Sequence, residues 1–166
     1  MNYTNKAIFL DRDGVLNRER GEYTFRPEDF DIIDGVPEAL IALKKKGFHL
    51  VVITNQAGIA KGLYQKSDVL ACHELLQKTC SFCIDHLYYA PWHPVISESL
   101  SRKPGTLMFE RAIARYKIDA GLSYMVGDKE RDLIPAKKLD IQTVSVAENV
   151  KADLHISSLP DLVPLV

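Results

Sequence analysis

Three things are scarce in this chain of 166 residues: cysteine, an excess of charge of either sign, and long apolar runs. The three cysteines, Cys72, Cys80 and Cys83, are an odd number, which favours reduced thiols in a cytoplasmic protein over a disulfide framework. Cys80-x-x-Cys83 is only half of a zinc site or a redox pair, and no second Cys/His pair at ligand spacing follows it. We therefore expect buried thiols near a helix end.

The balance of charge and the short apolar runs exclude several classes of protein. Lysine and arginine total 21 against 22 acidic residues, so the formal net charge is −1. This balance gives no general electrostatic basis for binding nucleic acid or an anionic membrane. No apolar run approaches the length of a membrane span, and we expect no signal or transit peptide. The length suits a single domain over residues 1–166, which we expect to be a cytoplasmic monomer.

Short apolar runs alternate with amphipathic stretches, a pattern typical of a parallel sheet flanked by helices. Strands are expected at Ala7–Leu10, Leu50–Thr54, His86–Ala90, Tyr124–Val126 and Gln142–Val146, with a short sixth at Leu154–Ile156. Helices are expected at Pro37–Lys46, ended by Gly47; at Asp68–Phe82, capped by Ser67; at Thr106–Tyr116; and at Glu130–Leu139, where Pro135 indicates a kink or a late start. The fold class is α/β, a three-layer Rossmann-like sandwich around a mostly parallel sheet.

One segment does not fit this alternation. Residues 15–34 are too polar and irregular for a helix that crosses from one strand to the next. We expect this segment to form a flap or hairpin over one end of the sheet, and we expect no separate cap domain.

Polar residues follow the expected strands, at the edge where an open α/β sheet binds its ligands. They are Asp11, Asp13 and Gly14 after the first strand, Thr54 and Asn55 after the second, Arg102 and Lys103 in the loop after the third, and Asp128, Lys129 and Asp132 after the fourth. A single aspartate at a strand end is more often a helix cap. The convergence of three carboxylates, a hydroxyl and a lysine on one edge indicates a site.

This set of residues is complete for phosphoryl transfer. A carboxylate can attack phosphorus and hold the group as an acyl phosphate, which splits one hard hydrolysis into two easier steps. Because the attack brings one anion to another, a divalent cation and a lysine are needed to offset the charge. A site rich in oxygen ligands favours Mg²⁺. Two aspartates beside the metal can divide the roles of nucleophile and general acid.

The same residues carry a family resemblance. The segments "FLDRDGVLN", "IDGV", "VVITNQAGIAKG", "RKP" and "YMVGDKERD" contain four ordered motifs that resemble those of the haloacid dehalogenase (HAD) superfamily of phosphatases. Together they resemble the capless D-glycero-D-manno-heptose 1,7-bisphosphate phosphatases and the related histidinol-phosphatases, over nearly the whole chain.

The resemblance implies a role for each residue that matches a motif. It implies that Asp11 is the nucleophile, that Asp13 is the general acid/base, and that Mg²⁺ is held by Asp11, Asp128 and the backbone carbonyl of Asp13, with the carbonyl of Lys129 as a further candidate. It implies that Thr54 and Lys103 bind the phosphoryl group and that Arg102 binds the rest of the substrate. Beside these, we expect Asn55 to bind the phosphate, and Arg20 and Lys129 to bind the substrate. For Asp132, orientation of the metal site and a plain capping role remain equal alternatives.

The chain departs from the family in the loop after the third strand. Many relatives hold a structural zinc there with four Cys and His ligands. The matching positions here are Ala90, Trp92, Ser99 and Ser101, none of which is a good zinc ligand, and His93 stands alone beside them. We therefore expect no zinc. Because this loop borders the pocket, the change also weakens the inference to one sugar phosphate.

Several alternatives stay open or are excluded at this point. The favoured reaction is removal of the 7-phosphate of heptose 1,7-bisphosphate, since Arg18, Arg20 and Arg102 could meet a second anion. Histidinol phosphate is the main alternative substrate, and a nucleic-acid 3′-phosphate is more remote. A phospho-receiver module would need an acceptor after the third strand, where the chain has Ala90 and Pro91. A calcium loop at residues 11–22 is rejected because an apolar pair occupies positions that need an oxygen ligand and a glycine.

Overall fold

A computed structural model describes residues 3–166, and its centre is a six-stranded sheet in which every strand pair is parallel. The strand order is β3-β2-β1-β4-β5-β6. The strands are β1 (Lys6–Leu10), β2 (Phe48–Asn55), β3 (His86–Ala90), β4 (Tyr124–Gly127), β5 (Gln142–Ser145) and β6 (Leu154–His155). The expected "mostly parallel" sheet is thus wholly parallel, and all six expected strands are present.

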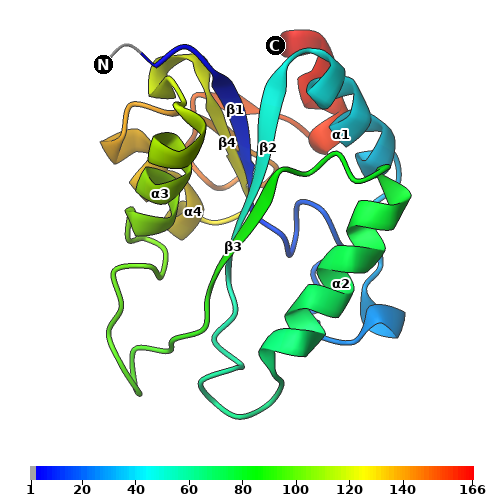
Figure 1. Ribbon diagram of the computed structural model, residues 1–166, viewed down its shortest axis with the longest axis vertical. Coiled ribbons are helices and arrows are strands. Elements are labelled where there is room, and N and C mark those ends of the chain that lie inside the picture. Colours follow the sequence, from blue (N-terminus) through cyan, green and yellow to red (C-terminus); the bar gives the residue numbers. More distant parts are fainter. Residues whose placement is uncertain (1–2) are drawn as a thin grey trace.

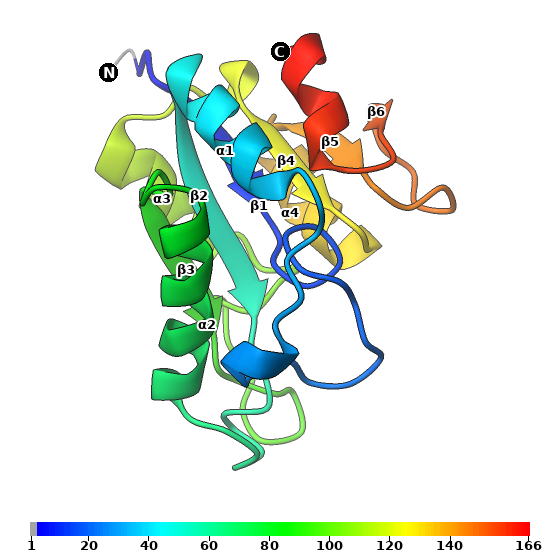
Figure 2. The same cartoon turned by 90° about the vertical axis from the view of Figure 1, so that its right-hand side faces the viewer.

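Helices cover both faces of this sheet and make the three layers of the fold (Figure 1). The α-helices are α1 (Val36–Lys45), α2 (Lys66–Thr79), α3 (Leu107–Tyr116) and α4 (Glu130–Lys138), and short 3₁₀ helices lie at Pro27–Asp29, Ala120–Leu122 and Leu159–Leu165. Viewed from the side, α1 and α2 lie on the near face of the sheet, and α3 and α4 lie behind it (Figure 2). The described residues contain no inserted cap domain, as expected.

The two faces of the sheet bury different side chains, because successive side chains of a strand point in opposite directions. On β1, Ile8 and Leu10 join the cluster that packs under α1 and α2, whereas Ala7 and Phe9 join the cluster under α3 and α4. A strand buried on both faces reads as a continuous apolar run. This explains why β1 shows no alternation in the sequence.

Helix α2 differs most from the expectation, and the other helix bounds lie within one residue of it. Helix α2 begins at Lys66 and not at Asp68. Its N-cap is Gln65, whose N–H donates to the Asp68 carboxylate at 2.7 Å. The expectation that Ser67 is the cap was therefore wrong. Helix α2 ends at Thr79, before Ser81 and Phe82, which have left-handed φ values of 55° and 57°. Pro135 lies inside α4, which begins at Glu130, so a late start was wrong.

The segment expected to be a flap closes back on itself beside the carboxyl ends of the strands. Asn17 and Ile32 form an antiparallel bridge, and the Arg18 N–H donates to the Asp31 carbonyl. Val15 and Leu16 are nonetheless buried in the core. The base of the flap is therefore anchored by apolar burial, although its sequence is polar overall.

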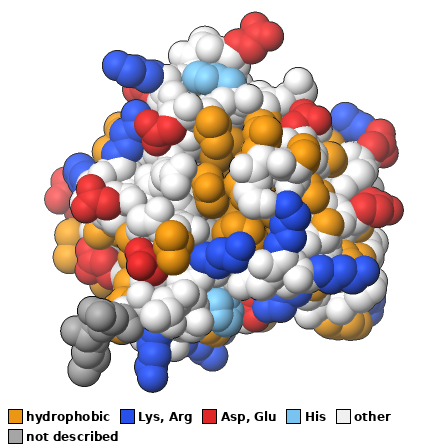
Figure 3. All heavy atoms as spheres, turned by 90° about the horizontal axis from the view of Figure 1, so that it is seen from above, with side chains coloured by type: hydrophobic (Ala, Val, Ile, Leu, Met, Phe, Trp, Pro, Cys, Tyr) orange, Lys and Arg blue, Asp and Glu red, His pale blue; other side chains and the backbone are white. Residues whose placement is uncertain are grey.

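The opposite end of the molecule, which carries both termini, is seen in Figure 3. Hydrophobic side chains gather at its centre, with basic side chains beside them. The cysteines are free: Cys72 and Cys80 are buried, and Cys83 is partly exposed. No helix among the described residues is both long and apolar enough to span a membrane.

Candidate active site

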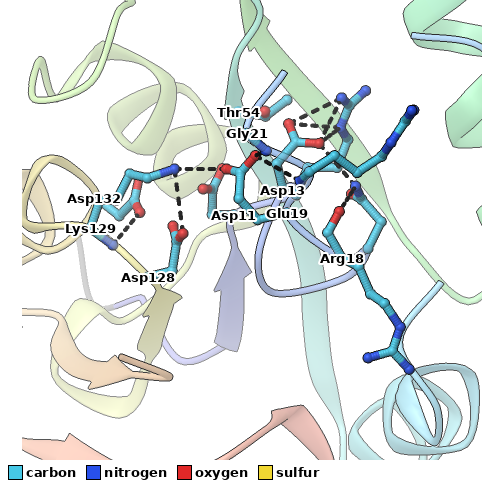
Figure 4. Close-up of polar contacts among 12 residues, drawn as sticks. Asp11, Asp13, Arg18, Glu19, Gly21, Thr54, Asp128, Lys129 and Asp132 are labelled. Atoms are coloured by element: carbon cyan, nitrogen blue, oxygen red, sulfur yellow. Dashed lines mark hydrogen bonds and ion pairs between the residues drawn. The ribbon is translucent and has the colours of Figure 1, made fainter. Parts of the chain in front are cut away.

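The strand ends bring the expected acidic residues together. Leu10 of β1 pairs with Val52 of β2 and with Val126 of β4, so the residues that follow these three neighbours reach the same edge. The Asp11 N–H continues the β1–β4 ladder and donates to the Val126 carbonyl at 3.0 Å. Figure 4 shows the result, in which Asp11, Asp128 and Asp132 lie side by side.

Lys103 is a buried cation at the centre of this group. Its ammonium lies 2.8 Å from Asp11 Oδ1 and 2.7 Å from Asp132 Oδ1, and it donates to the Ile53 carbonyl at 2.8 Å. The residue is only 2% exposed. Asn55 holds its backbone in place, because the Asn55 amide accepts from the Lys103 N–H at 2.9 Å and donates to the Lys103 carbonyl at 3.1 Å. Both polar atoms of the Asn55 amide thus bind the backbone of Lys103.

Burial and charge set the protonation of this cluster. Burial, and then the negative charge of Asp132, raise the pKa of Asp11 to about 7, although Lys103 opposes the shift. Burial also opposes ionisation of Asp132, but Lys103 outweighs it and holds the pKa of Asp132 below its usual range. The same two carboxylates keep the pKa of Lys103 above its usual value in spite of burial. Lys103 therefore remains a cation.

The carboxylates fit a divalent cation. Asp11, Asp128 and Asp132 each offer one oxygen, and these oxygens lie within 4.8 Å of one another. Three carboxylates outnumber the ammonium of Lys103, and the ammonium of Lys129, 3.4 Å from Asp128 Oδ2, offsets only part of the remaining negative charge because it also pairs with Glu19. The Oδ1 atom of Asp128 is buried and has no hydrogen-bond partner, which is costly unless a cation meets it. Carboxylate oxygens are the ligands that Mg²⁺ prefers.

Two glycines make room for these carboxylates. A Cβ at Gly14, which has φ +89°, would lie 2.5 Å from Asp128 Oδ2. A Cβ at Gly127 would lie 2.5 Å from the Cβ of Asp132. Larger residues at either position would displace the acids, so the close approach of the strand ends requires both glycines.

The carboxylate of Asp13 is held by Arg12. The Arg12 guanidinium donates to both Asp13 oxygens, with Nη2 at 2.9 and 3.0 Å, and Asn17 Nδ2 donates to Asp13 Oδ1 at 3.0 Å. Arg12 is itself 3% exposed and donates to the Thr24 carbonyl at 2.6 Å. These contacts fix the orientation of the Asp13 carboxylate.

A cavity of about 730 Å³ reaches the acidic cluster at Asp11, whereas Asp128 and Asp132 are not among its lining residues. Asp11, Asp13, Thr54, Asn55, Lys103, Arg102 and Lys129, all expected site residues, line it. The cavity has the size of a small-ligand site.

The cavity does not take in every residue that the sequence suggested. Arg20 is not among its lining residues, and its guanidinium pairs with Glu22 and Asp29. Arg18 pairs instead with Asp31 and Asp34.

An ion pair crosses the cavity between the flap and α4. Lys129 Nζ lies 2.9 Å from Glu19 Oε2 and 3.4 Å from Asp128 Oδ2. The other oxygen of Glu19 accepts from the N–H groups of Arg20 and Gly21 (Figure 4). Lys129 thus shares its charge between the flap and the acidic cluster, and the negative charges of both raise its pKa despite burial.

Sequence reasoning missed several residues of the cavity wall. Arg12 lies between the two motif aspartates, where the sequence indicates no role for it, yet its guanidinium binds the Asp13 carboxylate. Gln56 follows the motif threonine, and its amide contacts Thr54 and Asp13. Arg131 lines the cavity from α4, where an exposed helix arginine would carry no signal. The adjacency of these residues to the four motifs was the only available clue.

In the loop after β3, where we expect no zinc, two hydroxyls contact each other. Ser99 Oγ and Ser101 Oγ lie 2.7 Å apart, and Arg102 Nη1 donates to the Trp92 carbonyl at 3.2 Å. Two neutral hydroxyls that satisfy each other are poor ligands for Zn²⁺. The absence of zinc stays a prediction.

Comparisons with known proteins agree with this geometry. Residues 100–164 match the family model described as HAD-hydrolase-like. The chain is 38% identical to the D-glycero-beta-D-manno-heptose-1,7-bisphosphate 7-phosphatase of Haemophilus ducreyi, over 97% of this chain and 98% of that protein. It is 40% identical to the D-glycero-alpha-D-manno-heptose-1,7-bisphosphate 7-phosphatase of Burkholderia mallei, over 78% of this chain and 72% of that protein.

A solved structure shows the same fold. The D,D-heptose 1,7-bisphosphate phosphatase from B. bronchiseptica, complexed with magnesium and phosphate, superposes with a TM-score of 0.87 at 23% identity, covering 98% of this chain and 97% of that one. With a near full-length relative at 38% identity and a HAD-like site, the chain belongs to the haloacid dehalogenase superfamily, in the family of the heptose 1,7-bisphosphate 7-phosphatases, and is a phosphoric monoester hydrolase.

Proposed function

We propose that the chain hydrolyses the 7-phosphate of D-glycero-D-manno-heptose 1,7-bisphosphate with Mg²⁺, through an aspartyl phosphate on Asp11. The single observation that supports this most is the buried contact of Lys103 with both Asp11 and Asp132, at 2.8 and 2.7 Å, at the base of the cavity. It supports the proposal because the carboxylate of Asp11, the proposed nucleophile, lies beside a permanent positive charge. The names of the near full-length relatives support the substrate.

In the first step the Asp11 carboxylate forms a bond to phosphorus while the bond to the sugar oxygen breaks. The Lys103 ammonium and the Thr54 hydroxyl bind the oxygens of the transferring group, where negative charge must be offset. In the second step water attacks the same phosphorus, releases inorganic phosphate and restores Asp11. Asp11 has to be ionised to attack, so Lys103 assists the step twice, by favouring the carboxylate and by binding the phosphoryl group.

Asp13 would move the proton in both steps. As an acid it protonates the departing sugar oxygen, and as a base it takes a proton from the attacking water. Arg12 and the amide of Asn17 hold its carboxylate in the cavity wall, where it would face the leaving group. Because Asp11 and Asp13 have different surroundings, one carboxylate can act as the nucleophile and the other as the general acid and base.

Mg²⁺ would be held by the carboxylates of Asp11 and Asp128 and by the backbone carbonyl of Asp13. When bound, it offsets the charge between the carboxylate and the phosphate, as divalent cations do in phosphoryl transfer. Asp132 holds Lys103 and the Lys129 N–H, at 2.7 and 3.1 Å, so it fixes the lysine and the helix start next to the metal ligands.

The second phosphate of the substrate would meet Arg102 and Arg131, which both line the cavity. Within residues 3–166 neither forms an ion pair. Burial, together with the charge of Arg131, lowers the pKa of Arg102, which indicates two cations facing the same space. An anion between them would relieve this repulsion, and guanidinium groups bind phosphate oxygens bidentately. Histidinol phosphate offers an amine at that end instead.

We further propose that the whole reaction resides in one domain, residues 1–166, acting as a cytoplasmic monomer on a small phosphorylated substrate and not on nucleic acid or a membrane. The near-neutral charge and the three free thiols support this setting.

The test is a panel of phosphate esters assayed with Mg²⁺: both anomers of heptose 1,7-bisphosphate, histidinol phosphate and a simple sugar monophosphate. We expect the highest kcat/KM for a heptose bisphosphate anomer. Faster turnover of histidinol phosphate would contradict the assignment of the substrate and leave the phosphatase chemistry intact.

A further inference from the structure

We propose that Tyr64 is a positioning residue that acts through Gln56 to aim the hydroxyl of Thr54 at the phosphoryl group. The inference rests on the proposed function, since it takes Thr54 to bind that group. Tyr64 lies ten residues beyond Thr54 in the chain, between β2 and α2, and is not among the residues that line the cavity.

Tyr64 is fixed on several sides. The residue is 5% exposed. Its ring stacks on the Phe25 ring, with centroids 5.1 Å apart and planes inclined by 10°. The Tyr23 ring packs edge-on against it, with centroids 5.9 Å apart. On another side, a Cβ at Gly58 would lie 2.0 Å from the ring. Two flap residues and the loop after β2 therefore clamp the ring, so the position of its hydroxyl is set before any ligand arrives.

The hydroxyl of Tyr64 meets the side chain of Gln56. It donates to Gln56 Oε1 at 2.7 Å, in a buried contact. An amide oxygen accepts only, so the tyrosine must be the donor in this arrangement. Burial raises the pKa of Tyr64 to about 12, and the hydroxyl thus keeps its proton at every working pH.

Gln56 passes this orientation on to Thr54. Its Nε2 donates to Thr54 Oγ1 at 2.9 Å and faces Asp13 Oδ2 at 3.4 Å. The reversed amide would turn its oxygen toward the carboxylate of Asp13, which sets two acceptors against each other. Asp13, which can only accept, therefore selects this amide orientation, and the Tyr64 hydroxyl stabilises it by donating to Gln56 Oε1.

The orientation of the amide decides where the Thr54 proton points. Because Thr54 Oγ1 accepts from Gln56, its own O–H must donate elsewhere. Thr54 is 1% exposed and lines the cavity, and its hydroxyl donates to no acceptor among the described residues. Since Thr54 lines the cavity, we infer that this proton points into it. A phosphoryl oxygen there would accept this proton, whereas a flipped amide would accept it instead and withdraw it from the substrate.

The experiment is a double-mutant cycle on the magnesium-loaded full chain, with inorganic phosphate as competitive inhibitor. Tyr64→Phe keeps the ring and removes only the hydroxyl. We expect it to raise the Ki of phosphate about 5-fold, the effect of one hydrogen bond of ordinary strength. In a Thr54→Val background, which has no hydroxyl to aim, the same change should leave the Ki unaltered.

Two further variants separate positioning from folding. Gln56→Met removes the amide at similar length and should raise the Ki as Tyr64→Phe does, also without effect in the Thr54→Val background. Tyr116→Phe is the matched control, because its hydroxyl donates to the Asp85 carbonyl at 3.2 Å, outside the residues that line the cavity. It should cost similar thermal stability and leave the Ki unchanged.

The outcomes are distinct. If Thr54→Val weakens phosphate binding but Tyr64→Phe does not, or if the two effects multiply in the double variant, the positioning role of Tyr64 is wrong and the proposed function stands. If Thr54→Val itself leaves Ki, KM and kcat unchanged, the role of Thr54 in the proposed function fails, and this inference fails with it.

Discussion

The ammonium of Lys103 lies 2.8 Å from the carboxylate of Asp11, although 92 residues separate them in the chain. The contact is almost fully buried, and a second carboxylate, Asp132, completes it at 2.7 Å. Burying an ammonium between two carboxylates has a desolvation cost that can exceed their attraction, so stability alone does not account for this cluster. The site therefore lowers the stability of the fold while it provides the groups that the reaction needs. The contribution of each residue can be tested separately.

Lys103→Met should impair both stability and activity. The change leaves Asp11 and Asp132 buried without their cation, so we expect the metal-free protein to lose about 3 kcal/mol of unfolding free energy. Phosphate release should fall by at least about 100-fold, as when a charge-stabilising donor is removed. Lys44→Met is the control, since it breaks a more exposed pair with Asp85. Equal effects of both variants on activity would contradict the role of Lys103.

Asp11→Asn should stabilise the metal-free protein at pH 8 more than at pH 5. The raised pKa of Asp11, about 7 in the folded chain, means that the folded state binds this proton more tightly than the unfolded state. Stability therefore falls as pH rises from about 4 to about 7, and asparagine removes this penalty. Thermal unfolding in chelator at both pH values measures it, with a gain of a few degrees expected at pH 8.

The control for that experiment is Asp140→Asn, an exposed aspartate beyond the far end of α4. Asp140→Asn should change the unfolding temperature by the same small amount at pH 5 and at pH 8. A gain from Asp11→Asn that is equal at pH 5 and pH 8 would show that the burial of its charge is not the cause.

Mg²⁺ should raise the thermal stability of the wild type and be needed for turnover. A ligand that binds only the folded state stabilises it by about 2.7 kcal/mol at one hundred times its Kd. Asp128→Asn should lose most of this shift, because the unpartnered buried oxygen of Asp128 is a proposed ligand. Chelation should stop phosphate release, and Mg²⁺ should restore it. Elemental analysis that finds stoichiometric zinc would contradict the reading of Ser99 and Ser101.

Arg102→Ala and Arg131→Ala should each raise KM for the heptose bisphosphate about 10-fold more than for a sugar monophosphate. Each loses one charge-assisted contact to the second phosphate, of roughly 1.4 kcal/mol. Arg111→Ala, an exposed arginine of α3 that does not line the cavity, should change neither KM. An equal rise in KM for both substrates would mean that these arginines do not read the second phosphate.

The sequence anticipated the parts of this protein that depend on local pattern. The six strands and the motif residues at their carboxyl ends could be predicted, because apolar runs and strand-end acids leave clear signals. The Tyr64–Gln56 contact could not, since it depends on how the loop after β2 folds back under Phe25 of the flap. The start of α2 was missed because Asp68, which looked like the first helical residue, instead accepts a hydrogen bond from the Gln65 N–H.

Local pattern also failed where one residue has two partners in space. Asp132 had two equal readings, a cap or a residue that orients the metal site. It does hold the Lys129 N–H at 3.1 Å, and it also pairs with Lys103, so its two oxygens are used differently. Asp132 is 0% exposed, so its carboxylate needs the buried cation of Lys103 as a partner. This burial results from the packing of the helix start against the sheet, and the sequence of the helix start alone does not reveal it.

The measurement that tests the central claim most directly is phosphate release from heptose 1,7-bisphosphate with Mg²⁺, counted per chain for the wild type and for Asp11→Asn. We expect many phosphates per wild-type chain and almost none from Asp11→Asn, which keeps the shape of the side chain but is a poor nucleophile. Undiminished release by Asp11→Asn, or a wild type that retains one phosphate per chain and then stops, would contradict the account.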